Sequence, residues 1–121
     1  MDTVGQCKRI RFVALRQQIM LTTPFKGQID FYDLQSRSIF TTIQSKVGVE
    51  ITAEYVNKKQ TMIFVGLGNG EVHQYDIMEL SLVAEFRMHP QRKSSPVVVI
   101  TETCNGIYVG HQDGTIRAIM T

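Results

Sequence analysis

The strongest constraint on the fold is an internal repeat centred on three glycines. Gly27, Gly70 and Gly114 are separated by 43 and 44 residues. Each is followed by a polar, a β-branched and a second polar residue, and a large apolar residue stands two positions further on. In the first two copies that residue is a tyrosine before an aspartate, in the pairs Tyr32-Asp33 and Tyr75-Asp76. A period of this length indicates copies of one supersecondary unit.

The sequence around the glycines has the chemistry of a β-hairpin. Ile63–Gly70 and Ile107–Gly114 match at the apolar and glycine positions, whereas Met20–Gly27 matches them less well. The dipeptides Asn69-Gly70 and Asp113-Gly114 tolerate the positive φ that a tight turn requires. A glycine-rich phosphate loop is the alternative for residues 66–70, but it requires a following helix, and a strand-like alternation follows instead.

Further strand-like segments surround each predicted hairpin. Apolar strands are expected upstream at Arg9–Leu15, Val49–Tyr55 and Val97–Thr101, and outer strands at Ile39–Gln44 and Leu82–Met88. The segment Ile77–Arg87 fits a helix about as well as a strand. One unit is thus four antiparallel strands, and the third copy ends after its third strand. This is the unit length of a propeller blade.

These features resemble the WD-repeat family of β-propellers. In that family the third strand of a blade ends in Trp-Asp and follows a hairpin of the form Asp/Asn-Gly-Thr-Ile. The matching stretches are Asn69–Asp76 and Asp113–Ile119, and the resemblance covers residues 8–121. The chain has no tryptophan, and Tyr32, Tyr75 and Ile119 stand in its place. The hydrogen-bonded Asp–His–Ser–Trp set of the family is complete in no unit.

The resemblance implies an all-β fold, a partial propeller in one domain over residues 1–121. Its blade-like units are expected at 8–45, 46–89 and 94–121. Because propellers close with about four to eight blades, we expect a homodimer or completion of the ring by another chain. Met1–Cys7 could supply the missing strand of a partner's last blade, and the chain could also be a piece of a longer protein. A small β-barrel or sandwich is the alternative architecture.

The function that this fold implies is a non-catalytic protein–protein interaction or scaffold module within a multi-subunit complex. The residues that mark the repeat are expected to be structural, at hairpins and strand ends: Gly27, Gly70, Gly114, Tyr32, Asp33, Tyr75 and Asp76. Fold alone does not identify the partner.

A basic segment between the second and third units suggests an alternative function. Arg87–Ser95 contains Arg87, His89, Arg92 and Lys93, and it would form a loop on the ring's face. Loops on rigid scaffolds often bind ligands. An anionic group, such as a phosphoinositide headgroup or a phosphopeptide, could dock there.

Composition and spacing exclude several other classes. The net charge of +2 is too small to indicate a nucleic-acid partner. No apolar run approaches the ~20 residues of a membrane span, and the start lacks a signal-peptide core, so we expect a cytoplasmic protein. The histidines His73, His89 and His111 lack metal-ligand spacing, and Cys7 and Cys104 form no motif. We therefore expect no metal, no cofactor and no catalytic site.

Overall fold

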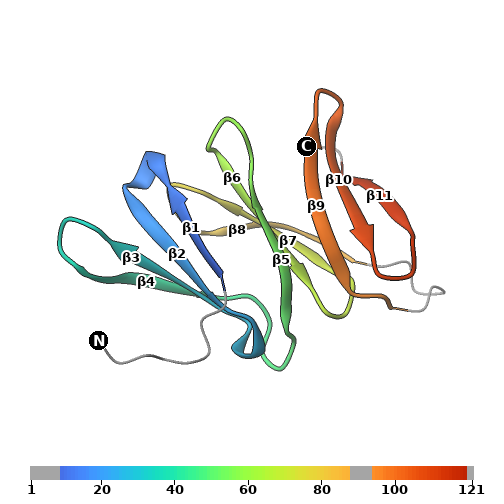
Figure 1. The fold of residues 1–121 in the computed structure, drawn as a ribbon, viewed down its shortest axis with the longest axis horizontal. Helices are drawn as coiled ribbons and strands as arrows, with labels where there is room; N and C mark the ends of the chain where they lie inside the picture. Colours follow the sequence, from blue (N-terminus) through green and yellow to red (C-terminus); the bar gives the residue numbers. More distant parts are fainter. Residues whose placement is uncertain (1–8, 88–93, 120–121) are drawn as a thin grey trace. The chain divides into compact units, whose positions relative to one another are not determined.

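The computed structural model describes residues 9–87 and 94–119, which form eleven strands in three sheets (Figure 1). The first sheet contains β1 (Arg9–Val13), β2 (Gln18–Thr23), β3 (Gln28–Asp33) and β4 (Ser38–Gln44). The second contains β5 (Ile51–Val56), β6 (Met62–Leu67), β7 (Val72–Asp76) and β8 (Leu82–Phe86). The third contains β9 (Val97–Thr103), β10 (Gly106–His111) and β11 (Ile116–Ile119). In each sheet, neighbours in sequence are neighbours in space.

The expected all-β fold is confirmed, and so is the early end of the third unit after its third strand. The ambiguous segment Ile77–Arg87 contains a strand, β8, and not a helix. The strands form three separate small sheets, so the barrel alternative is wrong. Within residues 9–87 and 94–119, helical structure is limited to 3₁₀ turns at Ala14–Arg16 and Pro24–Lys26, and no helix is long enough to cross a membrane.

The second and third hairpins have the same turn, bond for bond. The amide of Gly70 donates to the Leu67 carbonyl at 3.0 Å, and that of Gly114 donates to the His111 carbonyl at 2.9 Å. Both glycines have φ of +90°. The preceding Asn69 and Asp113 each accept a hydrogen bond from the amide two residues ahead, at 3.0 and 2.9 Å. Glycine relieves the steric cost of this left-handed conformation, which explains the repeat's most regular position.

The first hairpin contains one additional residue, which explains its weaker match in sequence. Asp30 and His73 both stand three residues after their glycine, yet Asp30 pairs with Leu21 whereas His73 pairs with Val65. Leu21 lies six residues before Gly27, whereas Val65 lies five before its own glycine. The extra residue is taken up in the 3₁₀ turn Pro24–Lys26. The structural equivalent of Val65 is therefore Leu21.

The chain divides into two compact units, one with the first sheet and one, from Thr52 onward, with the second and third sheets. Within the second unit, the sheets share a buried core, made of Ala53, Phe64, Val72, Val97, Ile100, Ile107, Val109 and Ile119. Gly66 of β6 allows a close approach of the two sheets, since a Cβ there would lie 2.5 Å from Cγ1 of Val97 on β9. Val97 is fully buried. The face of the second sheet that carries Gly66 thus fits the face of the third that carries Val97.

Candidate interaction surface

The third sheet ends in an open edge. In the second sheet, the third strand β7 pairs with β6 on one side and β8 on the other. The equivalent strand β11 pairs with β10, and no strand lies on its outer side in the described part of the chain. Backbone N–H and C=O groups along such an edge are available to a further strand.

One face of the third sheet is also apolar and exposed. Ile116 of β11 and Val99 of β9 both lie opposite Gly110 of β10, and they are 74% and 51% exposed. The equivalent of Ile116 in the second sheet is Val72, which is fully buried in the core shared with the third sheet. The sequence places equivalent apolar residues at both positions, but only Val72 has a neighbouring sheet against it among the described residues of its unit.

The first sheet exposes apolar residues on β1. Ile10 pairs with Leu21 and is 71% exposed, and Phe12 pairs with Ile19 and is 52% exposed. Ile100 of β9 pairs with Val109, the counterpart of Leu21, and is therefore the equivalent of Ile10. Ile100 is only 6% exposed because it lies in the core between the second and third sheets. The exposed face of the first sheet is thus equivalent to the face that the third sheet buries against the second.

Arg117 donates three hydrogen bonds, one within the third sheet and two to residues next to strands of the second sheet. Its Nε donates to Nε2 of His111 at 3.0 Å, and its Nη1 and Nη2 donate to the carbonyls of Arg87 and Gly70 at 3.2 and 2.9 Å. All three acceptors are uncharged when His111 is neutral. Partial burial lowers the pKa of the Arg117 guanidinium.

The neighbours of buried His111 define its tautomer. Its Nδ1 lies 2.9 Å from the Ser95 carbonyl oxygen, which can only accept, so Nδ1 carries the proton and Nε2 is free to accept from Arg117. The Ser95 hydroxyl in turn accepts from the amide of Asp113 at 3.0 Å. Sequence reasoning gave His111, Ser95 and Arg117 no joint role. Their proximity depends on pairing between β10 and β11 and on a loop contact, which no local motif encodes.

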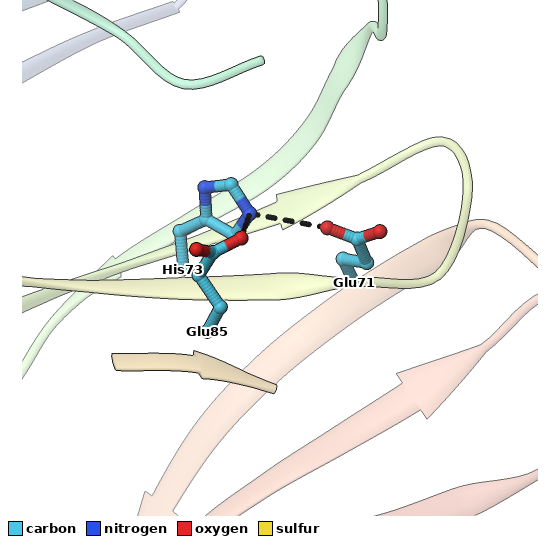
Figure 2. A group of neighbouring side chains, drawn as sticks. All are labelled: Glu71, His73 and Glu85. Carbon is cyan, nitrogen blue, oxygen red and sulfur yellow. Dashed lines mark hydrogen bonds and ion pairs between the residues drawn. The ribbon is translucent and has the colours of Figure 1, made fainter. Parts of the chain in front are cut away.

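A second polar cluster consists of Glu71, just before β7, His73 on β7 and Glu85 on β8 (Figure 2). Nε2 of His73 is 3.2 Å from Oε1 of Glu71 and 3.4 Å from Oε1 of Glu85. The side chains could surround a cation, but Nδ1 of His73 is buried without a partner among the described residues. A metal-bound histidine normally donates its other ring N–H to an acceptor. The arrangement fits better a histidine whose Nε2–H donates to the two carboxylates.

A cavity of about 550 Å³ lies between the second and third sheets. Phe64, Phe86 and Ile107 contribute apolar walls, and Glu102 is a charged lining residue. Oε1 of Glu102 already accepts from the Tyr55 hydroxyl at 3.2 Å and the Lys58 amide at 2.7 Å. The described lining residues contain one carboxylate, no histidine and no cysteine, so they offer no acid–base pair of the kind that hydrolytic sites use.

The basic residues expected to bind anions are only partly described. Arg87 is exposed, and its guanidinium lies 3.7 Å from Oε1 of Glu85. His89, Arg92 and Lys93 lie outside the described residues. An anion site in this segment therefore stays a prediction.

The aspartates of the repeat stand at strand ends and organise the turns that follow. Asp76 accepts hydrogen bonds from the amides of Met78 and Glu79 at 2.9 and 2.8 Å. Asp33 accepts one from the Ser36 amide at 2.8 Å, and this bond is the largest cause of the lowered pKa of its carboxyl. The tyrosines before them differ in burial, since Tyr75 is 5% exposed whereas Tyr32 is half-buried.

The sequence matches no protein-family model and no curated protein, but the fold has clear counterparts among solved structures. The C-terminal WD40 domain of Sif2 superposes with a TM-score of 0.76 at 18% identity, over 93% of this chain and 34% of that one. A chain of the mitotic checkpoint complex gives 0.66 at 16% identity, over 82% and 28%. The computationally designed protein Ika4 gives 0.69 at 18% identity, over 93% and 64%.

The chain thus spans about a third of the length of the WD40 domain that it resembles. Likeness at these identities concerns the fold, and it agrees with the three sheets, their strand order and the repeated hairpins. The chain therefore has the fold of the WD-repeat β-propellers, as three consecutive blades of which the third lacks its outer strand in the described residues.

Proposed function

We propose that the chain is a non-catalytic protein–protein interaction module that associates through the faces of its first and third sheets. The observation that supports this proposal concerns two exposed apolar faces, one on the first sheet and one on the third. They are equivalent to the two faces that pack against each other between the second and third sheets. The exposed Ile10 is equivalent to the buried Ile100, and the exposed Ile116 is equivalent to the buried Val72. In the second unit, these two kinds of face pack against each other. Exposed apolar patches of this type mark interaction sites.

The occupant that fits both faces is a second copy of the chain. The first sheet of one copy would pack on the third sheet of the other, as the third sheet packs on the second within one chain. Two such contacts would form per pair, and this closed arrangement gives a homodimer with six blades. A dimer that forms one ring leaves neither face in water, and six blades fall within the range of about four to eight at which propellers close.

Light scattering on single-site variants tests this proposal. The wild-type protein should have a mass near twice 13.7 kDa at concentrations where Ile10→Glu and Ile116→Glu are monomers, because a buried glutamate opposes packing. Val47→Glu is the matched control, since Val47 is 84% exposed and lies in a turn outside the sheets. This control should remain a dimer.

Mixing the two glutamate variants gives a sharper result. A pair made of one Ile10→Glu copy and one Ile116→Glu copy keeps one unaltered contact, between the normal first sheet of one and the normal third sheet of the other. The mixture should therefore regain association that neither variant shows alone. A folded wild-type monomer at all concentrations would contradict the second copy as occupant and would point to another chain. Equal masses for all variants would contradict the role of these faces.

A further inference from the structure

The third strand and the outer strand of each complete sheet carry a complementary polar pair at one register position. Asp30 of β3 lies opposite Thr42 of β4, whose hydroxyl donates to the Asp30 carboxylate. His73 of β7 lies opposite Glu85 of β8, whose carboxylate is 3.4 Å from Nε2. Both Asp30 and His73 stand three residues after the hairpin glycine. The outer residue therefore supplies whichever hydrogen-bonding partner the third-strand residue requires.

Arg117 occupies this position in the third sheet, three residues after Gly114. A guanidinium has five N–H donors and no acceptor. Three groups already accept from it, namely the His111 ring and the carbonyls of Arg87 and Gly70. Among the described residues, no carboxylate forms an ion pair with it. Its charge is thus partly desolvated and has no counter-charge within the described part of the chain.

The position next to the polar pair is apolar in both complete sheets. Ile43 lies opposite Ile29, and Phe86 lies opposite Val72. Two further apolar residues, Ile39 and Leu82, lie opposite the repeat tyrosines on the other side of the pair. In both outer strands, residues 39–43 and 82–86, the order is therefore an apolar residue, two residues of any type, the polar partner and a second apolar residue. The apolar residue at the end of this pattern would cover Ile116 on β11.

We propose that the edge of β11 binds an extended segment of the pattern apolar-any-any-acidic-apolar, with its acidic residue opposite Arg117. The segment runs antiparallel to β11, and its carboxylate uses the remaining N–H groups of the guanidinium. This inference rests on the proposed function, because it assigns the chemistry of a partner segment to the edge beside the apolar face. Charge-assisted hydrogen bonds of this kind are stronger than neutral ones.

The N-terminal segment of the chain does not match this pattern. Asp2 is the only acidic residue in residues 1–8, and it is followed by Thr3 and preceded by a single residue. The proposed pattern therefore does not favour Met1–Cys7 at this edge, and the expectation for that segment, which lies outside the described residues, stays a prediction. Under the proposed pattern, the occupant is a segment that lies outside residues 1–8.

A peptide titration followed by NMR tests the inference. The probe has the sequence of residues 80–87, Leu-Ser-Leu-Val-Ala-Glu-Phe-Arg, which fits the pattern and is taken from β8. Two control peptides replace its glutamate with glutamine, or exchange the alanine and the glutamate so that composition is unchanged while the acid moves by one register position. The probe should shift the amide signals of Ile116–Ile119. Both controls should bind about tenfold to a hundredfold more weakly, as loss of a charge-assisted bond predicts.

An Arg117→Gln variant of the protein extends the test. It removes the charge, so the glutamate and glutamine peptides should bind it equally. Folding of this variant is checked by circular dichroism, and the comparison of peptides on the wild-type protein does not depend on it. Equal binding of the three peptides to the wild-type protein, or no shift at β11, would overturn the inference. Either result leaves the mass of the Ile10→Glu and Ile116→Glu mixture unaffected, so the proposed function is tested separately.

Discussion

Gly66→Ala is expected to destabilise the packing of the second sheet against the third. A Cβ at Gly66 would lie 2.5 Å from Cγ1 and 2.7 Å from Cβ of Val97. Val97 is fully buried, so neither its side chain nor its strand can move away without disturbing the core. Overpacking of this kind typically costs about 1–3 kcal/mol. For a domain of this size, each kcal/mol lowers the melting temperature by about 4–8 °C.

Gly110→Ala is the matched control, because Gly110 is the equivalent position in the third sheet, 44 residues further on. A Cβ there would lie 2.8 Å from Cγ1 of Val99, whose side chain is half-exposed and can rotate away. We expect a change within about 0.5 kcal/mol in the free energy of unfolding of the monomer. If a second copy packs on this face as Val97 packs on Gly66, Gly110→Ala should nevertheless weaken dimerisation.

A double-mutant cycle with Val97→Ala separates the clash from general damage. Val97→Ala alone should cost about 2 kcal/mol through lost burial and the cavity left behind. In the double variant, the Cγ1 methyl group at 2.5 Å is gone and only the 2.7 Å contact to Cβ of residue 97 remains, so the clash is relieved in part. The total destabilisation should therefore be smaller than the sum of the two single effects by at least about 0.5 kcal/mol. The assay is urea denaturation followed by circular dichroism. Equal destabilisation by Gly66→Ala and Gly110→Ala, or strict additivity in the cycle, would refute the reasoning.

Three further predictions follow from the polar contacts. Arg117→Ala should lower the free energy of unfolding by about 1–3 kcal/mol. Arg117→Lys should be destabilised almost as much, because an ammonium group cannot donate to all three acceptors in the geometry of the guanidinium. Urea denaturation measures both changes. The pKa of Asp33 is lowered in the folded state, so its ionised carboxylate stabilises the fold above the unfolded pKa of about 3.9. This stabilisation is lost as the pH falls through the folded pKa. When the free energy of unfolding is measured against pH, it should therefore decline less steeply below about pH 4 in Asp33→Asn than in the wild type. Finally, added Zn²⁺ should leave the melting temperature unchanged, because Nδ1 of His73, which has no partner in the described ranges, disfavours a metal on Nε2. An upward shift of the melting temperature that Glu85→Gln abolishes would contradict this interpretation.

The repeat was predictable because its most informative positions are fixed by local backbone geometry. Gly70 and Gly114 must adopt positive φ, and an asparagine or aspartate before them accepts the same turn amide in both hairpins. Such constraints act within five or six residues and therefore leave a mark in the sequence. The segment around β8 was ambiguous because Leu82, Ala84 and Phe86 alternate within good helix formers, and pairing with β7 decided the outcome.

The candidate surface was less visible in the sequence, because exposure depends on which sheet packs on which face. Ile116 and Val72 look equivalent in the repeat, yet one is 74% exposed and the other is fully buried. Likewise, Arg117 is one cation among 13 in the sequence, and its bonds to Gly70 and Arg87 span 47 and 30 residues. The position of Arg117 relative to Gly114 was the available signal, but reading it required the paired registers of the other two sheets.

Amide hydrogen exchange along the third strand of each sheet tests the central claim most directly. In β7, hydrogen-bonded neighbours lie on both sides, so the amides of Val72–Asp76 should be protected continuously. In the monomeric protein, β11 has a neighbour on one side, so protection over Ile116–Ile119 should alternate from residue to residue. Continuous protection of these β11 amides in a monomer would contradict an open edge, and with it the account of an incomplete third blade.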